Sequence, residues 1–183
     1  MVNSMINKLK TIIRHLWLDA DDTHSAIPPD MLKRLAQRVA TSERRHSGEV
    51  RICVEASLPA SYVWRLDSNN PIRALSRQRA VMMFGKLRVW DTEHNNGVLI
   101  YLLLAEHAIE IVADRGLTKH VSTAQWQEMV AHMSVAFKVG QYEEGLTEAL
   151  AEISAVLMQH FAIGGAPGAA VNSNELPDNP LLM

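Results

Sequence analysis

The sequence predicts an α/β/α sandwich, in which a small mixed sheet with a parallel pair of strands and an antiparallel hairpin lies between helices. Three observations predict this fold class. One segment alternates apolar and polar residues, a second is apolar at nearly every position, and the segments around them carry apolar residues at helical spacing. With 183 residues and 48% hydrophobic content, the chain is long enough for one such domain.

Residues 1–27 predict an amphipathic helix followed by a linker. Apolar residues recur at helical spacing from Met5 to Leu16, with Lys8, Lys10 and Arg14 largely on the other side. Two interpretations stay open for this helix: it packs on its own domain, or it contacts a membrane surface. The segment that follows reads DADDT and has the spacing of a phosphotransfer motif, but no apolar strand precedes it, so we reject that chemistry.

The main domain is expected over residues 28–162. The Pro28-Pro29 pair suits the first turn of a helix that runs to about residue 45. Residues 47–58 alternate at a period of two and predict a strand. A helix within residues 68–90 then returns the chain to a second strand at 97–105, whose continuous apolar character is typical of a central strand covered on both faces.

The remaining elements complete the sheet and one helical layer. A short link around residues 106–107 leads into a strand within 108–116, which predicts an antiparallel hairpin. Helices are expected from Thr123 to about Val139 and from Glu143 to Phe161. Residues 163–183 are rich in Gly, Pro and Asn without periodicity, which predicts a flexible tail whose last residues can dock.

Composition excludes several classes of function. The chain has 18 basic and 20 acidic residues, a formal net charge of -2, so it lacks the positive charge that a nucleic-acid partner requires. Its lone cysteine, Cys53, excludes an internal disulfide and suits a reducing compartment. No apolar run approaches the roughly 20 residues of a spanning helix, and no secretion signal is visible. We therefore expect a cytoplasmic protein without a transmembrane segment, at most peripheral at the inner face of the membrane.

Polar side chains are expected to gather at one edge of the sheet. If the first two strands are parallel, the segments before them meet, and the antiparallel third strand brings its far end to the same place. We call this the polar edge; its residues are His46, Ser47, Glu49, Asp91, Glu93, Asn95, Asn96, Asp114 and Arg115. The alternative is a set of solvated loop residues with a local ion pair between Asp114 and Arg115. The edge lies opposite the crevice where doubly wound folds bind ligands, which argues against a nucleotide enzyme.

Carboxylate and amide oxygens at this edge favour Ca²⁺ or Mg²⁺ over zinc. The predicted metal ligands are Asp91, Glu93, Asn95 and Asp114. An EF-hand is excluded, because its sixth position is Asn96 rather than Gly and its twelfth is Leu102 rather than Glu. A looser calcium loop remains open, and no motif points to an organic cofactor.

Several motifs resemble the TPM domain family. They are Asn96-Gly97-Val98-Leu99, Gly116-Leu117, and Phe137, Gly140, Tyr142, Gly145 and Leu146, within a likeness over about Arg44 to Phe161. The segments HSGE, LRVWDTEHNNGVLIYLLLAE, VADRG and NELPDNP resemble more narrowly a bacterial subgroup of short, unsecreted TPM proteins, often encoded beside LemA-like and larger secreted TPM proteins.

The resemblance implies an α/β/α sandwich and a link to membrane-associated processes, with a LemA-like or larger TPM protein as a partner. In relatives from the thylakoid lumen it implies acid phosphatase activity and calcium binding. This chain departs from the family where a Gly-Tyr-Gly turn becomes Asp114-Arg115-Gly116. The resemblance supplies no set of catalytic residues.

These observations lead to two hypotheses for function. The first is a non-catalytic binding or interaction module whose polar edge takes a divalent cation or a partner. The alternative is a weak metal-assisted acid phosphatase, in which Asp91 and Asp114 hold the ion, Arg115 contacts phosphate and His46 moves a proton.

Overall fold

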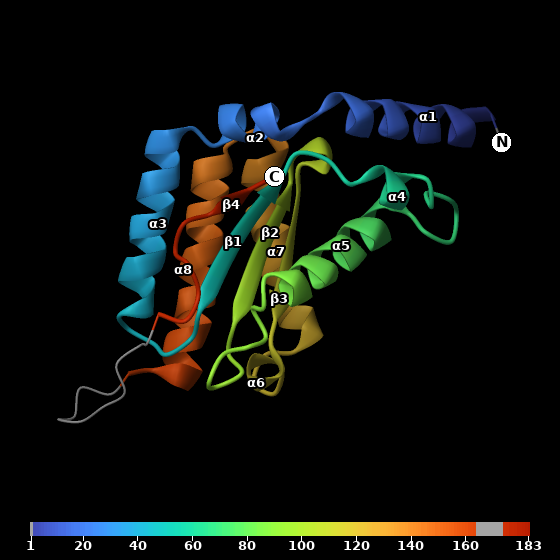
Figure 1. Cartoon of the computed structure of the whole chain (residues 1–183). Coiled ribbons are helices and arrows are strands. Elements are labelled where there is room, and N and C mark those ends of the chain that lie inside the picture. Colours follow the sequence, from blue (N-terminus) through green and yellow to red (C-terminus); the bar gives the residue numbers. More distant parts are fainter. Residues whose placement is uncertain (1, 164–173) are drawn as a thin grey trace.

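The computed structural model describes residues 2–163 and 174–183, which form a four-stranded sheet between helices (Figure 1). The strands are β1 (Val50–Glu55), β2 (Val98–Leu103), β3 (Ala108–Ala113) and β4 (Leu181–Leu182). Their order in the sheet is β3-β2-β1-β4. The β1 and β2 strands are parallel, β3 is antiparallel to β2, and β4 runs parallel to β1 at the other side. The predicted mixed sheet is therefore confirmed, with one strand more than expected.

Helices cover both faces of the sheet, as the predicted sandwich requires (Figure 1). One face packs against α3 (Pro29–Glu43), α7 (Thr123–Lys138) and α8 (Tyr142–Phe161). The other face packs against α5 (Ile72–Lys86) and the short α4 (Ala60–Val63). Each face of the sheet has its own core. Because side chains alternate along β1, Val50, Ile52 and Val54 enter the first core, under α3, α7 and α8, and Cys53 enters the second core, under α4 and α5.

Three short helices fill segments in which the sequence pattern is weak. The α2 helix (Ala20–Ala26) begins at Asp19, whose carboxylate accepts the backbone N–H of Asp21 while Asp22 accepts the N–H of Asp19. The DADDT segment therefore forms a capping box. The α6 helix (Arg115–Thr118) follows β3, and a 3-10 turn, η1 (Leu104–Glu106), closes the hairpin between β2 and β3.

The C-terminal segment docks along β1. Leu176 is buried in the second core, and its backbone N–H donates to Glu49 Oε2 over 3.0 Å. Arg51 donates to the carbonyl oxygens of Pro177 and Asn179. Residues 174–183 thus pack on the sheet as β4 and its lead-in, whereas 164–173, the middle of the predicted tail, lie outside the described residues.

The first helix, α1 (Val2–Trp17), extends away from the sheet, and its C-terminal end meets the body beside α4 and η1 (Figure 1). Within the described ranges, we find no helix both long enough and apolar enough to cross a bilayer.

Candidate functional site

Strand pairing assembles the polar edge as the sequence predicts. Val50 pairs with Val98, and Val98 pairs with Ala113, so the segments before β1 and β2 meet the segment after β3. Side chains then join these segments: Asn96 Nδ2 donates to Ser47 Oγ over 3.2 Å, and Arg115 Nε donates to Asn95 Oδ1 over 2.8 Å. Three distant stretches of chain therefore share one hydrogen-bonded surface.

Backbone geometry explains two of the glycines at this edge. The carbonyl oxygen of Asn95 accepts the N–H of Gly116 over 2.9 Å, and a Cβ on Gly116 would lie 2.4 Å from that oxygen. A Cβ on Gly97 would lie 2.0 Å from the carbonyl oxygen of Val89. Because real Cβ atoms cannot approach an oxygen so closely, only glycine allows these loops to pack together.

The four predicted metal ligands are not all available in this conformation. The Asp91 carboxylate pairs with Arg88, and Asn95 Oδ1 is occupied by Arg115. The backbone N–H of Glu93 lies 3.2 Å and 3.3 Å from the two carboxylate oxygens of Glu175. In the described part of the chain, no three or more His, Cys, Asp or Glu side chains are grouped to hold a metal ion.

Asp114 is the predicted ligand with an unsatisfied oxygen. Its Oδ1 accepts the backbone N–H of Arg115 over 2.6 Å and caps α6. Its Oδ2 is buried and has no hydrogen-bond partner among the described residues. The expected ion pair between the Asp114 and Arg115 side chains is not formed there either, since the Arg115 side chain turns to Asn95. A buried carboxylate oxygen without a partner is costly, and a bound cation would relieve that cost.

His46 and Glu49, expected at the edge surface, are both completely buried. His46 Nδ1 lies 3.0 Å from the carbonyl oxygen of Gly48, and Nε2 lies 2.8 Å from Ser42 Oγ. Burial lowers the pKa of His46 to about 4, so the imidazole is neutral at pH 7, with Nδ1–H donating to Gly48. Burial likewise raises the pKa of Glu49. Neither side chain can exchange protons with a surface ligand in this conformation.

A hollow of about 550 Å³ opens at the polar edge, beside the end of α8. It is lined by Ser47, Glu93, His94, Asn95 and the turn at 161–163. The sequence prediction omitted His94, although its place inside the segment 91–96 could have identified it. The hollow offers a carboxylate, an amide and a hydroxyl to a small ligand, a donor set that suits a hard cation.

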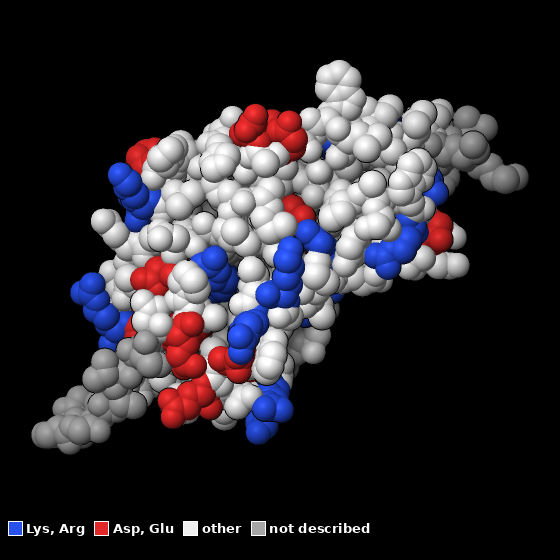
Figure 2. Space-filling view, viewed as in Figure 1, with Lys and Arg blue, Asp and Glu red and all other residues white. Residues whose placement is uncertain are grey.

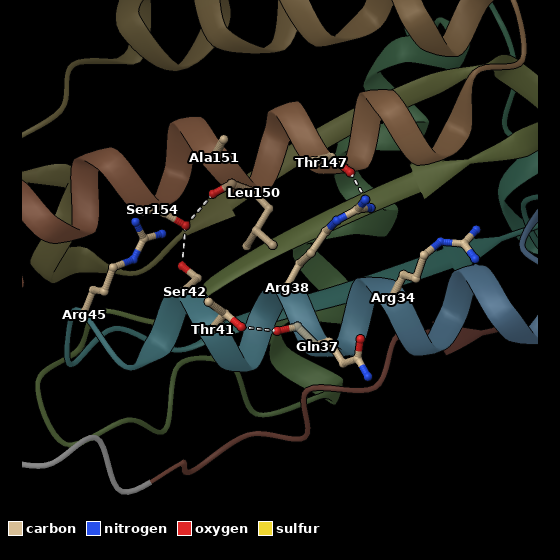
Figure 3. A pocket seen from close by; sticks show the side chains of 10 residues that line it. All are labelled: Arg34, Gln37, Arg38, Thr41, Ser42, Arg45, Thr147, Leu150, Ala151 and Ser154. Carbon is tan, nitrogen blue, oxygen red and sulfur yellow. Dashed lines mark hydrogen bonds between the residues drawn. The ribbon is translucent and has the colours of Figure 1, made fainter.

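A second groove, of about 540 Å³, lies between α3 and α8 and was missed by sequence reasoning (Figure 3). Arg34, Arg38 and Arg45 line one side: the first two lie four residues apart on one face of α3, and Arg45 lies in the turn after it. Hydrogen bonds from Arg34 and Arg38 lower the pKa of the Glu143 carboxyl to about 2. That pairing neutralises much of the positive charge, which leaves Arg45 as the guanidinium that an anion would meet.

The floor of this groove joins two helices through hydroxyl groups. Ser42 Oγ of α3 contacts Ser154 Oγ of α8, and Ser154 Oγ donates to the carbonyl oxygen of Leu150 over 2.6 Å (Figure 3). Because Ser42 also contacts the buried His46, the network holds α3 against α8 just below the polar edge. We interpret it as a packing element of the two helices.

Comparisons with known proteins agree with this architecture. The TPM domain model matches residues 21–156. The BA42 protein of the psychrophilic bacterium Bizionia argentinensis superposes with a TM-score of 0.68 at 22% identity, covering 85% of this chain and 94% of that one. The N-terminal domain of a P. gingivalis protein gives 0.56 at 17% identity, covering 73% and 79%. No curated protein matches the sequence. The chain belongs to the TPM domain family.

Proposed function

We propose that this TPM protein is a non-catalytic binding module whose polar edge takes a divalent cation, Ca²⁺ or Mg²⁺, and presents that edge to a partner protein. The observation that carries the proposal is the buried, partnerless Oδ2 of Asp114, at an edge where a hollow exposes further oxygen donors. A cation there would satisfy an atom that the protein leaves unsatisfied.

The other three predicted ligands can turn to the cation at a small cost in free energy. The Asp91 carboxylate is 42% exposed, and its ion pair with Arg88 is a surface contact of the kind that contributes about 0–1 kcal/mol. Asn95 would have to release Arg115, and Glu93 is exposed and free to turn. Because the ligands must rearrange, we expect weak affinity, with a Kd on the order of 10⁻⁴ to 10⁻³ M.

Titration calorimetry with CaCl₂ and MgCl₂ tests this proposal. The wild-type protein should release or take up heat at millimolar cation, its Tm should rise because only the folded state holds the ion, and emission from the neighbouring Trp90 should change. The variant Asp91→Asn/Asp114→Asn should lose all three responses. The control Glu128→Gln/Glu148→Gln, which removes two exposed carboxylates from α7 and α8, should keep them. An unresponsive wild-type protein would contradict the proposal.

A weak metal-assisted acid phosphatase is the second candidate. The observation in its favour is the exposed Arg115 beside Asp114, because a guanidinium next to a bound cation suits a phosphate group. The burial of His46 removes the proton carrier that this mechanism requires, so we rank it second. Turnover of an aryl phosphate that needs added metal and is lost in Asp91→Asn would reverse the order.

The proposal also concerns location and partners. We place the protein in the cytoplasm, at the inner face of the membrane, with a LemA-like or larger TPM protein as its partner. The buried reduced thiol of Cys53 and the family resemblance support this location. Cell fractionation with and without high salt tests it: recovery in the membrane pellet at low salt is expected, and recovery only in the soluble fraction would contradict it.

A further inference from the structure

The α1 helix is attached to the rest of the protein through Ile12, which packs against the second core, and through polar contacts near its C-terminal end. His15 is buried; its Nδ1 accepts the backbone N–H of Leu58 over 3.0 Å, and its Nε2 lies 3.1 Å from Glu106 Oε1. Arg14 pairs with the same Glu106 carboxylate. Just after the helix, Ser57 Oγ donates to the carbonyl oxygen of Leu18 over 3.1 Å. These contacts fix the rotation of α1 about its own axis.

That rotation turns the apolar side of α1 outward. The exposed residues are Ile6, Leu9, Ile13, Leu16 and Trp17, with exposed fractions from 45% to 82%. At roughly 100° per residue they fall within an arc of about 100°, on the side away from His15. We call these five residues the apolar stripe. Amphipathic helices of globular proteins normally bury such a stripe against the core, so its exposure here indicates a surface that meets something else.

Charge on the helix indicates what the stripe meets. Lys8, Lys10 and Arg14 lie on α1, which has no acidic residue between Val2 and Trp17. Lys8 and Lys10 are both exposed. At roughly 100° per residue Lys10 borders the stripe beside Trp17, whereas Lys8, seven residues before His15, lies on the His15 side of the helix. In Figure 2 the surface over α1 is mostly uncharged. An apolar stripe, a terminal Trp, the bordering Lys10 and the lack of acidic residues on α1 match helices that lie in the interface of an anionic bilayer.

We propose that α1 lies flat on an anionic lipid bilayer, with the apolar stripe in the boundary between headgroups and acyl chains and with Lys10 on lipid phosphates. This inference rests on the membrane location proposed above and is independent of the cation site. The stripe extends along about 17 Å of the helix axis. A helix that lies flat over this length contacts the boundary region of the bilayer without entering it deeply.

The docking of α1 also sets the orientation of the domain. His15 contacts Leu58 and Glu106, which follow the carboxyl ends of β1 and β2, whereas the polar edge lies at the amino ends of the same strands. Figure 1 shows α1 and the loop before α6 at opposite ends of the sheet. A domain held on the bilayer by α1 would therefore direct its polar edge away from the lipid, toward the aqueous side where a cation and a partner can reach it.

Vesicle co-sedimentation of the full chain tests the inference. Vesicles of phosphatidylcholine with one third phosphatidylglycerol should pellet the wild-type protein, and pure phosphatidylcholine should pellet at least about tenfold less. Leu9→Glu/Leu16→Glu should abolish pelleting, while the control Val135→Glu/Val139→Glu, at two exposed apolar positions on and just after α7, should leave it unchanged. Lys10→Glu, beside the stripe, should bind the anionic vesicles at least about tenfold more weakly.

Two outcomes would overturn the inference. One is failure of the wild-type protein to pellet with anionic vesicles; if cell fractionation still finds it at the membrane, the location holds through a protein partner and only the lipid contact is wrong. The other is a wild-type dimer that Leu9→Glu/Leu16→Glu converts to monomers without any change in lipid binding, since the stripe would then cover a second copy of the chain.

Discussion

The side-chain amide of Asn96 donates a hydrogen bond to the hydroxyl oxygen of Ser47 over 3.2 Å and joins two loops 49 residues apart. Asn96 is completely buried, and its backbone N–H donates to Thr92 Oγ1 over 3.1 Å. The same residue therefore shapes its own loop and ties it to the segment before β1. The polar edge depends on this one amide more than on any of its exposed charges.

We expect Asn96→Ala to lower the free energy of unfolding by about 1–3 kcal/mol, because it leaves buried polar groups without partners. Urea denaturation followed by circular dichroism measures the loss. The exposed Asn69→Ala serves as a comparison, since its side chain makes no hydrogen bond in the described structure. An Asn96→Ala protein as stable as the wild type would show that the loops are held together by other contacts.

Leu102→Asp should prevent folding. Leu102 is completely buried in β2, between Val54 of β1 and Ile109 of β3, and an aspartate there would place an unpaired charge in the core. Far-ultraviolet circular dichroism and a thermal melt give the result. Val135→Asp, at an exposed position of α7, should fold normally. A cooperative melt at the wild-type temperature for Leu102→Asp would mean that β2 is not central.

Glu43 should make stability depend on pH. Burial, with Glu49 and Asp178 nearby, raises the pKa of the Glu43 carboxyl to about 8, against an ordinary value of 4.5. The folded state therefore holds its proton more tightly than the unfolded state, so this stabilising contribution is complete below pH 4.5 and is lost as pH rises toward 8. One unit of pKa difference corresponds to about 1.4 kcal/mol.

Glu43→Gln removes the titrating group and can keep the acceptor for the backbone N–H of Val50. We expect the variant to gain about 3–4 kcal/mol over the wild type between pH 5 and pH 8. Comparing both proteins at each pH cancels the contribution of His46, whose lowered pKa acts in the opposite sense below pH 6.5. An equal stability difference at the two pH values would contradict the raised pKa.

The order of the main elements was predictable from the sequence because periodicity reports burial directly. Alternation of Val50, Ile52 and Val54 required a strand with two unlike faces, and the apolar run of β2 required cover on both sides. Pairing of those strands then predicted that the segments of the polar edge meet. The element that pattern could not predict is β4, because Leu181 and Leu182 are too few to show a period and their docking depends on distant contacts from Glu49 and Arg51.

The chemistry of the site was less predictable than its position. Burial of His46 and Glu49 follows from the packing of α3, α8 and the C-terminal segment, which no local pattern records. The pairing of Asp91 with Arg88 and of Asn95 with Arg115 depends on the three-dimensional positions of the two arginine side chains. Sequence reasoning missed the buried ion pair of Glu55 with Arg79, because an arginine in a helix ordinarily faces solvent. The Glu55 carboxylate also accepts the hydroxyl of Tyr101.

Binding of a divalent cation at the polar edge can be followed residue by residue in a two-dimensional NMR titration of the ¹⁵N-labelled protein with CaCl₂. We expect saturable shifts with a Kd on the order of 10⁻⁴ to 10⁻³ M, confined to the backbone amides of residues 91–97 and 114–117 and to their neighbours at 46–49. Asp114→Asn should remove them. Shifts scattered over the acidic surface without saturation, or none at the edge up to 10 mM Ca²⁺ (about ten times the weakest expected Kd), would contradict it.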